Sequence, residues 1–259
     1  MDPLGIVGIV IALSSVVGLM VVEGTSPMAI LLPGPMIIVL LGTIGAGLAG
    51  SVWVDVKWAV KNLPRALVGK APQPGETIDT IVHLADRARR EGMLALEEEI
   101  RTIEDPFLKQ GLNAAIDGAD SDELREMLEG VIATKRSQDK IAAKFYMELG
   151  GYAPTIGIIG TVVSLVHVLE NLSDVVALGP MIASAFVATL WGVMTANMIW
   201  LPIGNRLTRL SAMECAQMEI TLEGLISLQS GASPRIVVSR LNSLLPAPRQ
   251  EEQKQKKAA

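Results

Sequence analysis

The sequence predicts an all-α membrane protein with four transmembrane helices and a helical cytoplasmic domain between the second and the third. The 259-residue chain is 50% hydrophobic, and it contains four long apolar stretches without Asp, Glu, Lys or Arg. These stretches form two pairs that are separated by a charged segment. A stretch of about 20 apolar residues can cross a bilayer as a helix. The stretches are Leu4–Val22, Ala29–Val54, Tyr152–Leu169 and Leu178–Ile203.

Basic residues flank the apolar stretches on one side only. Lysines and arginines follow the second stretch, precede the third and follow the fourth, whereas the connections Glu23–Met28 and Glu170–Ala177 contain none. The positive-inside rule assigns such basic flanks to the cytoplasm. The sequence therefore predicts a multi-pass membrane protein with both termini in the cytoplasm.

The expected domain boundaries follow from this pattern. Residues 1–54 hold transmembrane helices 1 and 2, and residues 150–203 hold helices 3 and 4. Residues 55–149 form the cytoplasmic helical domain, and residues 204–249 form cytoplasmic C-terminal helices. The polar residues 250–259 are expected to be a disordered tail.

Local signals predict several helices within the charged segment. Gly92 is expected to end one amphipathic helix, and Met93–Ile103 to form the next. Asp120, followed three residues later by Glu123, resembles a capping box and predicts the start of a long helix.

Glycines recur at roughly helical spacing in the second apolar stretch. Small residues let neighbouring helices approach closely in lipid, although glycine is also simply common in membrane helices. We expect close helix packing at these positions, which are Gly42, Gly45, Gly47 and Gly50.

Composition argues against several classes of function. Aromatic residues make up 3% of the chain and the net charge is -5, so a surface that binds nucleic acid is not expected. The single cysteine, Cys215, excludes an internal disulfide and a multi-cysteine metal site. The sequence has no Walker loop, dinucleotide fingerprint, zinc spacing or nucleophile elbow. We therefore predict no catalytic residue, no metal and no cofactor.

The apolar stretches contain no carboxylate, although a protein that moves ions usually keeps an ionisable group at membrane depth. Any carboxylate that carries an ion would therefore come from a partner. Thr161 and Thr189 could bond to their own helix backbones or line a polar path. Pro154 and Pro202 each free a helix carbonyl, and each could be a static kink or a functional hinge.

A charged string between residues 88 and 99 is the main feature of the predicted cytoplasmic domain. It carries Arg89 and Arg90, followed by Glu97 and Glu98. Exposed charges of both signs suit electrostatic docking to a complementary partner. The alternative is a solvated helix face with pairs four residues apart.

At these residues the chain resembles the MotA/PomA family, the membrane subunit of the bacterial flagellar stator, within the MotA/TolQ/ExbB superfamily. The resemblance covers nearly the whole length. It rests on the Arg-Arg-x-Gly-x-Leu-Ala-Leu-Glu string from Arg89 to Glu97, and on the motifs Tyr152–Thr161, Ala188–Gly192 and Ala196–Pro202.

The resemblance implies a flagellar stator subunit in the bacterial inner membrane, surrounded by membrane lipid. Five copies would form a pentamer around two copies of a MotB-like, single-span partner, which supplies the ion-binding aspartate. The residue roles that the resemblance implies are contact with the rotor protein FliG for Arg89, Arg90, Glu97 and Glu98, conformational coupling for Pro154 and Pro202, and the ion path for Thr161 and Thr189.

The coupling ion is predicted from the position before Thr189. Sodium-type members resemble one another in having Thr-Thr before Leu-Tyr-Gly in the fourth span, whereas this chain has Ala188 at the first of these positions. The missing hydroxyl removes an oxygen that a dehydrated sodium ion would need, while a proton needs no such cage. We therefore expect H⁺ to be the coupling ion.

Three other functions compete with this interpretation. An ExbB/TolQ-type proton-driven energiser of envelope processes belongs to the same superfamily, but such relatives usually have three spans. A membrane adaptor without ion flux is also compatible with the missing carboxylate. A membrane enzyme is least favoured, because no nucleophile or acid–base pair lies in the apolar stretches.

Overall fold

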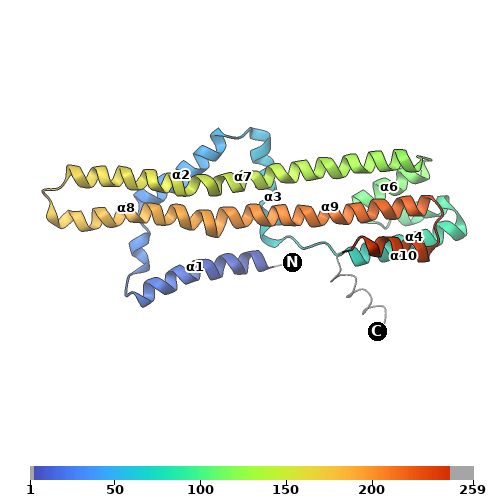
Figure 1. Ribbon diagram of the computed structural model, residues 1–259, viewed down its shortest axis with the longest axis horizontal. Helices are drawn as coiled ribbons and strands as arrows, with labels where there is room; N and C mark the ends of the chain where they lie inside the picture. The colour runs from blue at the N-terminus through green and yellow to red at the C-terminus, as the bar shows by residue number, and fades with distance from the viewer. Residues whose placement is uncertain (1–2, 246–259) are drawn as a thin grey trace. The chain divides into compact units, whose positions relative to one another are not determined.

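The computed structural model describes residues 3–245, and every regular element in that range is a helix (Figure 1). The all-α fold class is thereby confirmed. The chain divides into two compact units, residues 1–70 with 138–210 and residues 71–137 with 211–259. The expected tail, 250–259, lies outside the described residues.

The second apolar stretch is not one helix, which corrects the expectation of a continuous span over Ala29–Val54. The chain forms a 3₁₀ turn, η1 (Pro27–Ile30), then α2 (Pro33–Ala49), and then a separate helix, α3 (Trp53–Val68). Pro33 begins α2, where a missing N–H disrupts no helix bond. At about 1.5 Å per residue, the 17 residues of α2 rise about 25 Å, less than the hydrocarbon thickness of about 30 Å.

Within residues 3–245, three helical segments are long and apolar enough to cross a membrane, and α2 is a shorter apolar helix. They lie in α1 (Leu4–Val22), in α7 (Ser121–Glu170), and in the run that starts with α8 (Val175–Thr195). After α8, a π-helical turn, η3 (Ala196–Trp200), leads directly into α9 (Leu201–Gln229), so the chain stays helical from residue 175 to 229.

Within the first unit, α7 and α8 approach each other through small residues. A Cβ atom added to Gly192 would lie 2.6 Å from the carbonyl oxygen of Ala153, and one added to Gly157 would lie 2.9 Å from that of Ala188. Real Cβ atoms essentially never come this close to a neighbour, so glycine is required at this approach. Small residues have the same role where helices meet in lipid.

The glycines of α2 bear out the expected close packing in part. A Cβ on Gly42 would lie 2.8 Å from Cγ2 of Ile156, and one on Gly47 would collide with the side chain of Leu149. Both neighbours belong to α7. Gly45 faces open space, so its presence is not explained by helix packing.

A bidentate ion pair joins α3 to α7. Arg65 donates from Nη1 to Oδ1 of Asp139 at 2.7 Å and from Nη2 to Oδ2 at 2.9 Å. The Asp139 side chain is 3% exposed, so the pair is well shielded from water on the acidic side. The hydroxyl of Tyr146 also donates to the carbonyl of Ala59, at 3.1 Å. These bonds hold α3 against the start of the apolar part of α7.

The second unit is a bundle of amphipathic helices around one apolar core. Its elements include α4 (Pro74–Glu91), the 3₁₀ turn η2 (Met93–Leu96), α5 (Glu97–Ile100), α6 (Pro106–Ile116) and α10 (Pro234–Ser243). The first part of α7 and the last part of α9 complete it. The core residues with the largest fully buried side chains are Ile78, Ile81, Leu84, Leu96, Leu112, Leu124, Leu128, Leu225 and Leu241.

Two local expectations for this unit have different outcomes. The capping box is confirmed, because Asp120 accepts hydrogen bonds from the N–H of Asp122 and Glu123, and Glu123 accepts one from the N–H of Asp120. The helix expected over Met93–Ile103 is wrong. That segment contains a 3₁₀ turn and a four-residue helix, because the chain leaves Gly92 and ends after Ile100 through bonds three residues apart, from Ala95 N–H to the Gly92 carbonyl and from Thr102 N–H to the Glu99 carbonyl.

The approach of α7 to α8 can be tested by Gly192→Ala. The added methyl group would collide with the Ala153 carbonyl, so we expect the free energy of unfolding to fall by about 1–3 kcal/mol, as in other overpacked cores. Thermal unfolding of the purified protein in detergent measures the change.

Gly151→Ala, on the facing helix α7, is the matched control, because its Cβ would meet nothing within 4 Å. Alanine in a helix interior is favoured over glycine by about 0.5–1 kcal/mol, so the control should be unchanged or slightly more stable. Equal midpoints for the two variants would contradict the proposed close approach.

Candidate functional site

The structure brings Thr161 of α7 and Thr189 of α8 together. Their Oγ1 atoms are 2.5 Å apart, and Thr161 Oγ1 also lies 2.8 Å from the carbonyl oxygen of Ala185 and 3.1 Å from that of Gly157. A hydroxyl has one hydrogen to donate, so Thr161 can serve one of these oxygens at a time. The result is a cluster of two hydroxyls and two carbonyl oxygens between two apolar helices.

Ala188 lies beside this cluster and adds no oxygen to it. Its side chain is fully buried, and its methyl group would be 3.0 Å from a Cβ placed on Gly160. The methyl group therefore faces α7 at a point where that helix has no side chain. Ala188 therefore contributes to the packing of α8 against α7.

The two prolines lie on different helices of the first unit. Pro154 is inside α7, and Pro202 is the second residue of α9, directly after the π-helical turn. Proline has no N–H, so the carbonyl four residues earlier loses its helical donor; for Pro154 this carbonyl belongs to Gly150. Leu201, next to Pro202, packs on Gly150, where an added Cβ would be 2.6 Å from its Cδ2. The two irregular sites are thus in contact, and π-turns are frequent at functional sites.

Trp191 contributes a bond that the sequence analysis missed. Its indole Nε1 donates to the carbonyl oxygen of Ile30 at 2.7 Å, which ties α8 to the end of η1. Pro33 and Pro35 cannot donate, so few N–H groups are available near that carbonyl. A buried carbonyl without a donor is costly. The proline pair and a tryptophan within an apolar stretch were the available signals, but they do not show which groups meet.

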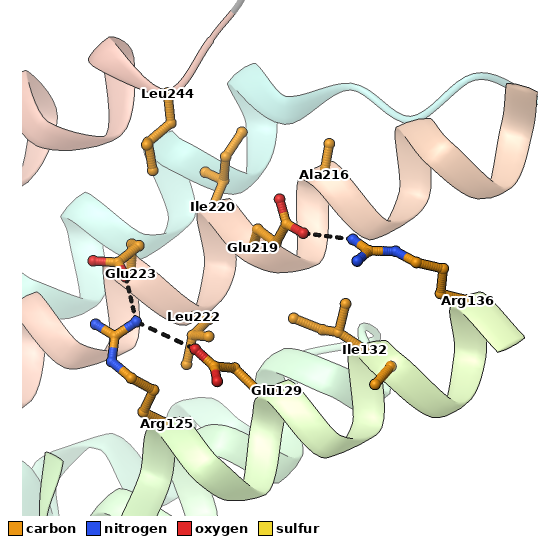
Figure 2. A pocket seen from close by; sticks show the side chains of 11 residues that line it. Arg125, Glu129, Ile132, Arg136, Ala216, Glu219, Ile220, Leu222, Glu223 and Leu244 are labelled. Carbon is orange, nitrogen blue, oxygen red and sulfur yellow. Dashed lines mark hydrogen bonds and ion pairs between the residues drawn. The ribbon is translucent and has the colours of Figure 1, made fainter. Parts of the chain in front are cut away.

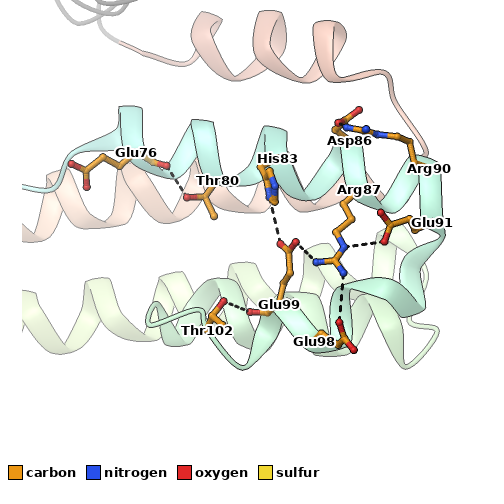
Figure 3. Close-up of polar contacts among 10 residues, drawn as sticks. All are labelled: Glu76, Thr80, His83, Asp86, Arg87, Arg90, Glu91, Glu98, Glu99 and Thr102. Carbon is orange, nitrogen blue, oxygen red and sulfur yellow. Dashed lines mark hydrogen bonds and ion pairs between the residues drawn. The ribbon is translucent and has the colours of Figure 1, made fainter.

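The four charged residues predicted for rotor contact are all exposed on the second unit. Arg89 and Arg90 lie in the last turn of α4, and Glu97 and Glu98 are the first two residues of α5. Figure 3 shows Arg90 and Glu98. Arg90 forms an ion pair with Asp86 one helical turn earlier, which is the local pairing expected of a solvated helix face. Gly92, with φ of 88°, allows the chain to turn between the two helices. The turn therefore places both signs of charge on neighbouring elements.

Arg87 is the centre of this charged region, and the sequence analysis missed it (Figure 3). Its guanidinium contacts Glu91 at 3.1 Å, Glu98 at 3.6 Å and Glu99 at 2.5 Å. The hydrogen bonds to Glu99 and Glu91 raise the pKa of Arg87 above its ordinary value, so this side chain stays charged. The spacing of Arg87 and Glu91 was a signal for a local pair, but the contacts with Glu98 and Glu99 depend on the turn at Gly92.

A cavity of about 510 Å³ lies between the parts of α7 and α9 in the second unit (Figure 2). Its charged groups pair with one another: Arg125 contacts Glu223 at 2.7 Å and Glu129 at 3.6 Å, and Arg136 contacts Glu219 at 2.6 Å. The hydrogen bond to Glu223 raises the pKa of Arg125. The pairs with Glu223 and Glu219 join α7 to α9, and the pair of Arg125 with Glu129 lies within α7.

Among residues 3–245, no group of three or more His, Cys, Asp or Glu side chains could hold a metal ion. The two histidines, His83 and His167, are largely exposed and each lies near a glutamate, and Cys215 is buried as a small apolar helix residue.

Two family models match the chain. That of the MotA/TolQ/ExbB proton channel family matches residues 99–220, and that of the motility protein A N-terminal region matches residues 6–92. The chain is 34% identical over 251 residues to Motility protein A of Bacillus subtilis (strain 168), covering 95% of this chain and 92% of the relative.

Two solved structures are similar over nearly the whole chain. The structure of C. jejuni MotAB has a TM-score of 0.92 at 28% identity, and covers 96% of this chain and 98% of its own. The flagellar MotAB stator complex from Bacillus subtilis has a TM-score of 0.88 at 33% identity, with coverages of 95% and 97%.

The bond between Trp191 and Ile30 can be tested by Trp191→Phe, which keeps an aromatic ring and removes the N–H. The Ile30 carbonyl would lose its donor, so we expect the free energy of unfolding to fall by about 1–3 kcal/mol. Trp53→Phe is the control, because Trp53 is 68% exposed. Thermal unfolding in detergent measures both variants, and a Trp191→Phe protein as stable as the control would show that this bond contributes nothing.

Proposed function

Because this chain belongs to the MotA/TolQ/ExbB proton channel family, we propose that it is the membrane subunit of a flagellar stator, a channel that converts ion-motive force into torque. Its likeness to motility protein A over nearly the whole length carries this proposal. The match of residues 6–92 to the motility protein A N-terminal model favours a flagellar role over that of the TolQ and ExbB members.

In this proposal the protein crosses the bacterial inner membrane four times, through α1, α2 and the apolar parts of α7 and α8. The segments 55–149 and 204–249, with both termini, lie in the cytoplasm, as the basic flanks indicate. The short helix α2 is accommodated by local thinning of the bilayer or by its flanking residues. Its contacts with α7 at Gly42 and Gly47 support a place inside the helix bundle.

A MotB-like, single-span subunit supplies the carboxylate that this chain lacks in its apolar helices. Both solved relatives are MotAB complexes, and five copies of this chain around two partners is the arrangement that we propose. Thr161 and Thr189 then provide polar atoms beside the partner's carboxylate. Protonation removes a charge that is costly in hydrocarbon, and Pro154 and Pro202 give the helices places to flex as the ring of subunits steps around the partner.

The proposed coupling ion is a proton, and the proposed contact with the rotor protein FliG is electrostatic. One charge that crosses a potential of 100 mV releases about 2.3 kcal/mol, so each step of rotation uses a small, repeated input. Exposure of Arg89, Arg90, Glu97 and Glu98 supports their role in transmitting the step. Such charges affect encounter rate and register more than raw affinity.

Deletion of the gene in its host tests the proposed function. We expect cells that carry flagella in electron micrographs but do not swim, and full recovery when the gene is restored. Normal swimming together with an envelope defect would instead favour an ExbB/TolQ-type energiser. Cells without flagella would contradict a role in torque generation.

The proposed ion can be tested in tethered cells by replacing sodium with potassium at constant proton-motive force. Because the Thr161–Thr189 cluster has no third hydroxyl from position 188, we expect the rotation speed to stay unchanged. Loss of rotation in potassium would show that sodium is the coupling ion. Thr161→Val should lower the speed in both media, whereas Thr155→Val, at an exposed hydroxyl of α7, should not.

A further inference from the structure

Arg87 contacts three carboxylates, which come from two different helices. Glu91 comes from its own helix, whereas Glu98 and Glu99 come from α5, on the far side of the turn at Gly92. The side chain of Glu99 is 18% exposed and that of Arg87 is 29% exposed. The contact between α4 and α5 is therefore partly shielded from water, unlike an ordinary exposed pair.

The helix α5, which Arg87 contacts, is too short to be stable without contacts to the rest of the unit. α5 has four residues, far fewer than an isolated helix needs to be stable. Leu96 and Ile100 attach it to the apolar core on one side. On the other side, Arg87 links the carboxylates of Glu98 and Glu99 back to α4, and His83 of α4 adds a contact with Glu99 (Figure 3).

Negative charge is in excess around the Arg87 guanidinium. Three carboxylates face it, from Glu91 on α4 and from Glu98 and Glu99 on α5. His83, on α4, also approaches Glu99, with its Nδ1 3.5 Å from Oε2. Without the guanidinium, these carboxylates would repel one another across the turn, and α5 would be pushed away from α4.

We infer that Arg87 is a positioning residue, which holds α5 so that Glu97 and Glu98 are presented beside Arg89 and Arg90. This inference rests on the proposed rotor contact of those four residues. Arg87 itself does not need to touch the rotor, because its guanidinium is already engaged by three carboxylates. Its role is to set the spacing of the charges that do.

An exchange of charges inside the chain tests this inference. Arg87→Glu should lower the motor torque at high load several-fold, and the double variant Arg87→Glu/Glu99→Arg should restore most of it, because the two charges again attract. Charge reversal on the rotor should not rescue Arg87→Glu. Normal torque in Arg87→Glu, or rescue by the rotor alone, would overturn the inference.

Hydrogen exchange of the purified stator complex gives an independent readout. We expect faster amide exchange over residues 93–103 in Arg87→Gln than in the native protein. Arg87→Lys keeps the positive charge, so it should exchange more slowly than Arg87→Gln. The charge-swapped variant Arg87→Glu/Glu99→Arg should exchange at the native rate. Unchanged exchange over this segment in Arg87→Gln would overturn the positioning role.

Arg90→Glu is the matched control, because it makes the same change of charge three residues away on the same helix. It should lower torque without changing exchange over residues 93–103, and reversal on the rotor should restore it. If cells with Arg90→Glu swim normally while Arg87→Gln speeds amide exchange over residues 93–103, the positioning role of Arg87 is supported and the proposed rotor contact is contradicted. The two failures are therefore distinguishable.

Discussion

The close approach of the α7 and α8 backbones is the constraint on which the first unit depends. Gly157 and Gly192 each face a carbonyl oxygen of the other helix, at distances that leave no room for a side chain. This approach lets Thr161 reach both Thr189 and the Ala185 carbonyl across the interface. With larger residues the hydroxyls would be held apart, and each would bond only to its own helix. The packing therefore creates the polar cluster.

Some polar atoms of this unit are paired in their apolar surroundings, whereas Thr43 Oγ1 and the indole N–H groups of Trp58 and Trp200 are buried without a hydrogen-bond partner among residues 3–245. The Thr161 and Thr189 hydroxyls satisfy each other, and the Trp191 indole satisfies the Ile30 carbonyl. No carboxylate lies within the apolar stretches, so an ion that enters needs a negative group from elsewhere. The missing charge and the paired hydroxyls are both consistent with the proposal that a partner supplies the carboxylate.

The sequence predicted several features that depend on neighbouring residues, although not the breaks before Trp53 and after Leu96, and it missed those that depend on distant residues. Hydropathy identified the apolar stretches, and the spacing of Asp120 and Glu123 identified a capping box. Hydropathy alone did not show that the second stretch breaks before Trp53, although Gly50 and Ser51 at the break are residues common in turns. The meeting of Thr161 with Thr189, which is 28 residues away, needed the packed helices. The same holds for Trp191.

Arg87 and Arg90 look alike in the sequence but differ in the number of ion-pair partners that each has. Arg87 and Arg90 lie three residues apart on α4, and both face acidic neighbours. Arg90 contacts Asp86 on an exposed surface, where such pairs contribute little and exchange readily. Arg87 is held by three carboxylates from two elements, so no approaching group can easily replace them. In the proposed rotor contact, an external carboxylate would compete for Arg90 and not for Arg87, which separates the binding role from the positioning role.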